Sequence, residues 1–116
     1  MKTKRVLLHL DDGLREAVDI EDIYYIEARE GDTLVRLRRK TPKIDKRRFE
    51  VTLPIFARAG LLRVHREFAV NLERIRYVRL REESREWEVV LTPPVNAVIP
   101  VSRQEYSKLI RTFENG

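Results

Sequence analysis

The sequence predicts a mainly β domain of antiparallel strands that ends in one short helix, and three observations predict this fold class. Apolar residues recur at every second position through most of the chain, which is the period of a half-buried strand. Near the C-terminus the spacing changes to that of an amphipathic helix. The 116 residues, 42% of them hydrophobic, can build one packed core and leave no room for a second module. We therefore expect a single domain over residues 1–116.

Four strands are predicted in the first third of the chain, separated by residues that favour turns. The Asp-Asp-Gly sequence at residues 11–13 would join the first two strands as a hairpin. Gly31 lies between the next two strands, where glycine adopts a positive φ at little cost. The four strands are expected at residues 6–10, 14–18, 23–28 and 33–39.

The middle of the chain is less regular. Residues 40–48 form a basic connection, which Pro42 keeps out of a central strand. Alternation resumes at residues 49–53, so we expect this segment to be extended. Pro54 can begin a short helix through Ala59, because the N–H that proline lacks has no partner at a helix start.

Short strands fill most of the remaining chain before the final helix. They are expected at residues 61–64, 68–70, 75–80, 87–91 and 97–99. The apolar residues at 106, 109, 110 and 113 then form one helical stripe. Ser102 and Glu105 have the spacing of a capping box, so the helix should begin at Arg103 and end near Glu114.

The charge is uneven along the chain, although 24 Lys and Arg against 19 Asp and Glu give a net charge of only +5. Residues 1–30 carry −3, residues 31–81 carry +10, and residues 82–116 carry −2. Most of the basic residues are arginine, whose planar set of donors suits phosphate and guanine edges. A basic middle segment is typical of a nucleic-acid binder, and a surface of mutual ion pairs would have the same composition.

Several classes of function have little support in the sequence. The absence of cysteine excludes disulfides, thiol catalysis and cysteine-rich zinc sites. No serine lies in a G-x-S-x-G motif, and no glycine-rich phosphate loop is present. His9 and Asp11 are too few ligands for a structural zinc ion. We therefore expect no enzyme activity, cofactor or metal.

No apolar run is long enough to cross a bilayer or to form a signal peptide. We therefore expect a cytoplasmic protein without a membrane partner.

Three segments carry motifs of one bacterial family, in the same order and at similar spacing. Residues 62–72 read L-R-V-H-R-E-F-A-V-N-L, where the family has L-R-V-H-R-S-Y-x-V-N. Residues 20–28 read I-E-D-I-Y-Y-I-E-A, close to the family's E-D-I-x-Y-I-E-A, and residues 99–103 contain its P-V-S-R. From about Val6 to Phe113, the chain thus resembles the LytTR family of bacterial DNA-binding domains.

The resemblance implies a fold of small antiparallel sheets and sequence-specific binding of double-stranded DNA by a bacterial transcription regulator. Family members insert side chains from three loops into successive major grooves, and a repeated site could hold a second copy of the chain. Here the loops correspond to residues 29–33, the residues after Val64, and the start of the last helix. The resemblance implies base contacts by Asp32, Arg66 and Arg103. Contacts to the DNA backbone or a loop-shaping role are implied for Arg29, Thr33, His65, Ser102 and Lys40.

Side-chain chemistry agrees with these roles and leaves alternatives. Arginine can donate two hydrogen bonds to guanine, whereas Asp32 can accept one from cytosine, orient a neighbouring arginine, or only stabilise its turn. Arg66 and Arg103 could instead pair with the nearby Glu67 and Glu105. His65 could be a half-buried residue that shapes its loop.

The sequence departs from the family pattern at four places. Glu67 replaces a serine, the segment between Leu53 and Leu61 is shorter than the usual helix, and the basic connection at residues 40–48 is longer. Residues 93–96, Pro-Pro-Val-Asn, replace a glycine turn.

Two competing functions remain from the sequence. One is a protein-interaction or dimerisation module without DNA binding. The other is RNA binding by a β surface, which normally needs exposed aromatic residues for stacking. Here most aromatic residues fall inside predicted strands, where packing is the more common role.

Overall fold

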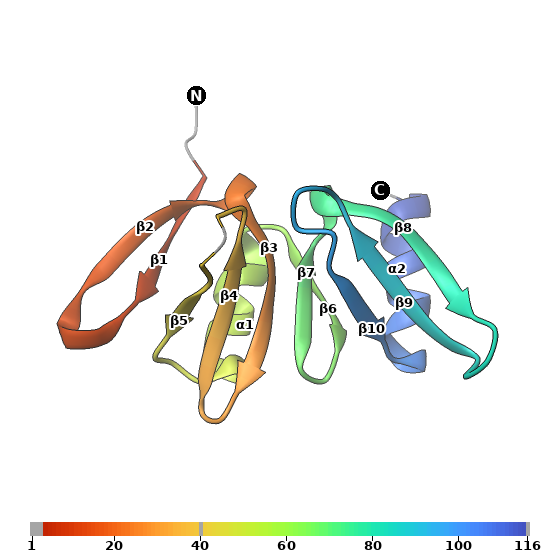
Figure 1. The fold of residues 1–116 in the computed structure, drawn as a ribbon, viewed down its shortest axis with the longest axis horizontal. Coiled ribbons are helices and arrows are strands. Elements are labelled where there is room, and N and C mark those ends of the chain that lie inside the picture. The colour runs from red at the N-terminus through yellow and green to blue at the C-terminus, as the bar shows by residue number, and fades with distance from the viewer. Residues whose placement is uncertain (1–3, 40, 116) are drawn as a thin grey trace.

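The computed structural model describes residues 4–39 and 41–115, which form ten strands in three antiparallel sheets together with two α-helices (Figure 1). The molecule measures 45 × 37 × 25 Å. A two-stranded sheet lies at one end, a five-stranded sheet in the middle and a three-stranded sheet at the other end. The predicted fold class of small antiparallel sheets with a C-terminal helix is confirmed. None of the described helices is long and apolar enough to cross a membrane.

The two-stranded sheet is the predicted N-terminal hairpin. Strands β1 (Arg5–His9) and β2 (Arg15–Asp19) pair antiparallel with Val6 opposite Val18. A 3₁₀ turn at Asp11–Gly13 joins them, and both Asp12 and Gly13 have positive φ, as the Asp-Gly signal predicts.

The five-stranded sheet has the order β5-β4-β3-β7-β6. Its strands are β3 (Ile23–Arg29), β4 (Asp32–Leu37), β5 (Lys43–Asp45), β6 (Leu61–His65) and β7 (Phe68–Asn71). A short 3₁₀ segment at Ile20–Asp22 precedes β3, and another at Leu72–Arg74 follows β7. Strand β5 lies inside the basic connection at residues 40–48 and is an edge strand, with Asp45 opposite Thr33, so the segment that contains Pro42 does stay out of a central strand.

Helix α1 (Phe49–Arg58) corrects two predictions. Residues 49–53 form its first half rather than an extended segment, and Pro54 lies inside the helix rather than at its start. Phe49, Thr52 and Phe56 are buried, and their spacings of three and four fit one face of a helix. The short alternation at residues 49–53 fits a strand equally well. Burial of this face therefore selects the helix, which is longer than the sequence predicts.

The three-stranded sheet has the order β10-β9-β8 and packs against the last helix. Its strands are β8 (Ile75–Arg81), β9 (Glu86–Leu91) and β10 (Val98–Val101). Asn96, in the turn before β10, has a φ of 52° and so adopts the conformation that a glycine would take there. Helix α2 (Arg103–Asn115) begins at the predicted residue, and its Tyr106 ring stacks on Trp87 at 4.0 Å between ring centroids.

The core consists of two clusters that share the five-stranded sheet. Ile26 and Ala69 belong to a cluster with the N-terminal hairpin and α1. Tyr24 and Val70, on the same two strands, belong to a second cluster with β8–β10 and α2. Because strands β3 and β7 are packed on both faces, they form a rigid support for the turns at their ends.

Candidate nucleic-acid interface

Three turns from distant parts of the chain lie along one edge of the molecule, at the bottom of Figure 1. They are the β3–β4 turn (residues 29–32), the β6–β7 turn (residues 65–68) and the β10–α2 junction (residues 101–103), and we call them together the loop edge. The Ala28 N–H donates to the Glu67 carbonyl at 2.9 Å, and the Ser102 N–H donates to the Val64 carbonyl at 2.9 Å. Backbone hydrogen bonds therefore join the three segments that the sequence singled out.

The β3–β4 turn presents an ion pair rather than an isolated carboxylate. Lys46 Nζ donates to Asp32 Oδ2 at 3.1 Å and lies 3.7 Å from Asp11 Oδ1. The hydrogen bond to Asp32 and the charges of both carboxylates raise the pKa of Lys46. Arg29 Nε donates a hydrogen bond to Glu27 Oε2 at 3.2 Å. The cation beside Asp32 is therefore Lys46, a residue of the basic connection at 40–48, and not an arginine.

Thr33, the residue after the β3–β4 turn, is completely buried. Its Oγ1 donates to the Arg47 carbonyl at 2.9 Å and lies 3.2 Å from Thr52 Oγ1 of α1. The Thr33 hydroxyl therefore points into the fold, toward Arg47 and Thr52. Lys40, for which a contact with the DNA backbone was expected, lies outside the described residues.

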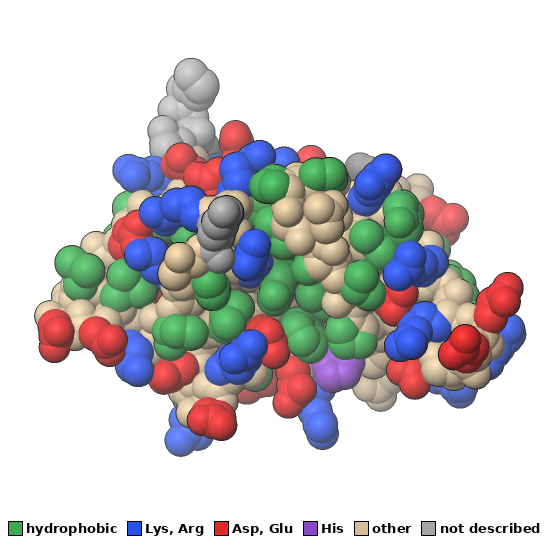
Figure 2. Space-filling view, in the orientation of Figure 1, with side chains coloured by type: hydrophobic (Ala, Val, Ile, Leu, Met, Phe, Trp, Pro, Cys, Tyr) green, Lys and Arg blue, Asp and Glu red, His purple; other side chains and the backbone are tan. Residues whose placement is uncertain are grey.

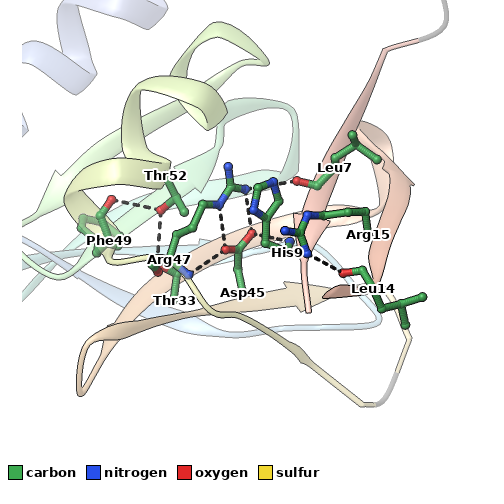
Figure 3. A network of polar contacts seen from close by, with 9 residues as sticks. All are labelled: Leu7, His9, Leu14, Arg15, Thr33, Asp45, Arg47, Phe49 and Thr52. Carbon is green, nitrogen blue, oxygen red and sulfur yellow. Dashed lines mark hydrogen bonds and ion pairs between the residues drawn. The ribbon is translucent and has the colours of Figure 1, made fainter. Parts of the chain in front are cut away.

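An ion pair between Asp45 and Arg47 lies beside Thr33, next to the β3–β4 turn (Figure 3). The fully buried Asp45 carboxylate accepts from Arg47 Nη2 at 2.8 Å and from Arg47 Nε at 3.0 Å. Burial alone would raise the pKa of Asp45, but hydrogen bonds from Arg47 and the His9 N–H together lower it. Arg47 also donates to the Leu7 carbonyl at 3.1 Å. The pair thus ties β1 to β5 and, through the Arg47 carbonyl, to Thr33 beside Asp32.

The β6–β7 turn exposes Arg66. The Arg66 side chain is exposed and has no hydrogen bond or ion pair with any residue that the structure describes, so the expected alternative partner, Glu67, does not hold it. His65 is partly buried, and its Nδ1 accepts from the Glu67 N–H at 3.0 Å while its ring meets Phe68 edge-on. These two contacts hold the His65 ring against the turn.

The β10–α2 junction exposes Arg103 in the same way. Ser102 caps the helix, because its Oγ accepts from the Glu105 N–H at 3.3 Å. Arg103 is the first residue of α2, is exposed, and has no side-chain hydrogen bond or ion pair within residues 4–39 and 41–115, with Glu105 or otherwise. Two unpaired guanidinium groups therefore lie on adjacent parts of the loop edge.

A pocket of ≈ 520 Å³ separates the β3–β4 and β6–β7 turns at the start of α1. Its charged lining is mixed, with three arginines and four carboxylates: Arg29, Arg48, Arg66, Glu30, Asp32, Glu50 and Glu67. In Figure 2, charged side chains of both signs likewise lie along this edge. The loop edge is therefore not a uniformly basic surface.

Part of the basic middle segment pairs with the acidic N-terminal segment. Arg38 lies 3.7 Å from Asp22, and Glu16 pairs with both Arg39 and Lys43. Such exposed pairs contribute little stability, about 0–1 kcal/mol each, but they reduce the free positive charge. In this part of the surface, the basic residues thus form ion pairs, which is the alternative to DNA binding that the composition left open. Within the described ranges, no three His, Cys, Asp or Glu side chains come together to hold a metal ion.

Comparison with known proteins agrees with the motifs. The family model described as LytTr DNA-binding domain matches residues 15–114. A similar solved structure is a LytTr DNA-binding domain from Bacillus cereus, taken from a protein described as a methyl-accepting/DNA response regulator. It has a TM-score of 0.72 and 20% sequence identity, and the alignment covers 99% of this chain and 100% of that one. None of the curated proteins compared matches the chain. Because the family model covers most of the sequence, the chain belongs to the LytTR family of DNA-binding domains.

Proposed function

We propose that the chain binds double-stranded DNA sequence-specifically, as the DNA-binding domain of a bacterial transcription regulator that works in the cytoplasm. The proposal rests on two exposed arginines, Arg66 and Arg103, whose side chains have no hydrogen bond or ion pair with the described residues. They lie on turns that backbone hydrogen bonds join. Each guanidinium can donate two hydrogen bonds to O6 and N7 of guanine, a contact that discriminates between bases by about 1–3 kcal/mol.

The three turns of the loop edge lie on one side of the molecule (Figure 1). In this proposal their side chains enter successive major grooves on one face of the duplex, as the family resemblance implies. A repeated site would seat a second copy on the next turns of the same face.

The other residues of the loop edge have supporting roles in this proposal. Asp32 holds Lys46, whose ammonium group contacts a phosphate or base acceptor beside the β3–β4 turn. Arg29 contributes a backbone contact when it leaves Glu27. His65 and Ser102 fix the shapes of their turns, and Ser102 leaves the first N–H groups of α2 directed at a phosphate.

Selection of bound duplexes from a random pool, followed by sequencing, tests this proposal. We expect a defined consensus, which a gel-shift titration then confirms as a lower Kd than for a scrambled duplex of equal length. Recovery of no consensus, with equal affinity for all duplexes, would contradict sequence-specific binding. Salt-insensitive association with a protein and no shift with any duplex would instead support an interaction module.

A further inference from the structure

We propose that Arg63 is a positioning residue that fixes the β6–β7 turn in the shape from which Arg66 reads DNA. This inference rests on the proposed function and extends it to a residue without an assigned role. Arg63 lies on β6 and is the first arginine of the L-R-V-H-R motif. Its side chain is 27% exposed, which is much less than a freely solvated arginine.

The guanidinium of Arg63 binds the turn through its backbone. Nε donates to the His65 carbonyl at 3.2 Å, and Nη2 donates to the Arg66 carbonyl at 2.5 Å. The next carbonyl, of Glu67, accepts from the Ala28 N–H at 2.9 Å. Three consecutive carbonyl groups of the turn are therefore held, two of them by Arg63.

The same guanidinium also joins the turn to helix α1. Nη2 lies 2.9 Å from Glu50 Oε2 and Nη1 lies 3.3 Å from Glu50 Oε1, a two-point ion pair. The guanidinium carbon lies 5.5 Å from the centre of the Phe49 ring. Since Phe49 is buried in the core, this contact connects the turn to the rigid part of the fold.

These contacts need the planar set of donors of arginine. A lysine at position 63 would keep the positive charge but could not reach both turn carbonyls and Glu50 at once. The replacement Arg63→Lys therefore separates positioning from charge. If Arg63 acts by charge alone, lysine should substitute for it; if it acts by positioning, lysine should not.

The positioning role predicts a loss of discrimination rather than of general affinity. Without the anchor, the turn must be ordered when DNA binds, and Arg66 no longer meets its base in a fixed geometry. Affinity for a scrambled duplex depends on phosphate contacts and should be unaffected.

The test compares Arg63→Lys with Arg58→Lys in gel-shift titrations on the selected duplex and a scrambled one. Arg58 is a matched control, because it is exposed at the far end of α1 and has no partner in the described part of the chain. We expect Arg63→Lys to reduce the ratio of specific to scrambled affinity about tenfold, with an unchanged thermal midpoint. Arg58→Lys should leave the ratio unchanged. Amide exchange at Arg66 and Glu67 in the free protein should become faster only in Arg63→Lys.

A ratio equal to that of the unsubstituted protein would overturn the inference and leave the proposed function standing. If the unsubstituted protein prefers no duplex, the proposed function fails and the inference fails with it. Should Arg63→Lys not fold, Glu50→Gln, which removes the ionic part of the anchor, replaces it with the same expected direction.

Discussion

The backbone N–H of Ser102 donates to the carbonyl oxygen of Val64 at 2.9 Å, so the start of helix α2 is fixed against the end of strand β6. Arg103 directly follows Ser102, and Arg66 lies two residues beyond Val64, so this hydrogen bond fixes the two segments that carry these arginines beside each other. Rigid placement of two donors is what base recognition needs, because a misplaced guanidinium loses one of its two hydrogen bonds.

The first prediction concerns base recognition by these two arginines. Arg66→Ala and Arg103→Ala should each reduce discrimination between the selected and scrambled duplexes by about 1–3 kcal/mol, because each removes a two-bond contact to a base. Gel-shift titrations on both duplexes measure the effect. Arg111→Ala is the control, since Arg111 is exposed and unpartnered within the described residues but lies toward the other end of α2. Unchanged site preference in both loop-edge variants would refute the assignment.

Lys46 should behave as a contact to the DNA backbone. Lys46→Gln removes one cation beside the β3–β4 turn, so the affinity for all duplexes should fall alike and the salt slope should decrease by about 0.9. The slope is read from titrations at several salt concentrations. Lys43→Gln is the comparison, because Lys43 is on β5 and pairs with Glu16. An equal decrease in both variants would show a general charge effect and not a contact at the loop edge.

The Asp45–Arg47 pair should contribute strongly to stability. Asp45→Asn leaves Arg47 without its charged partner inside the network, which we expect to lower the free energy of unfolding by about 3 kcal/mol. Urea denaturation followed by circular dichroism measures the change. Asp19→Asn offers a control, since its ion pair with Arg5 is exposed on both sides. Similar small losses in the two variants would mean that the buried pair is not a structural support.

The lowered pKa of Asp45 also predicts a pH dependence of stability. A carboxyl whose pKa is lower in the folded state stabilises the fold above its ordinary pKa of about 3.9, and this contribution is lost as the pH falls through the folded value. The unfolding free energy should therefore decrease below about pH 4, and less steeply in Asp45→Asn. Denaturation curves measured from pH 6 to pH 2 test this, and identical slopes in the two proteins would contradict it.

The sequence was sufficient to predict features that depend on neighbouring residues. The strand periods, the Asp-Gly turn and the start of α2 at Arg103 depend on local patterns and are confirmed. The first half of helix α1 was missed because the five residues at 49–53 suit either period, and only burial against the sheet selects one. The family motifs identified the three turns but not the contacts that support them.

Those supporting contacts cross the fold and have no local signal. Lys46 meets Asp32 and Arg63 meets Glu50 only because β5, α1 and the turns are brought together in space. The burial of Thr33 likewise depends on α1. The net charge of residues 31–81 overstated the free positive charge, since its pairing with Asp22 and Glu16 is a property of the folded surface.

If the loop edge is the surface that binds DNA, a nuclear magnetic resonance titration will locate the interface there. Labelled protein is titrated with the selected duplex while backbone amide shifts are followed. We expect the largest changes at residues 29–32, 65–68 and 101–105, and small changes at the far ends of α1 and α2. Large changes confined to the outer face of strands β8–β10, with the loop edge unperturbed, would contradict it.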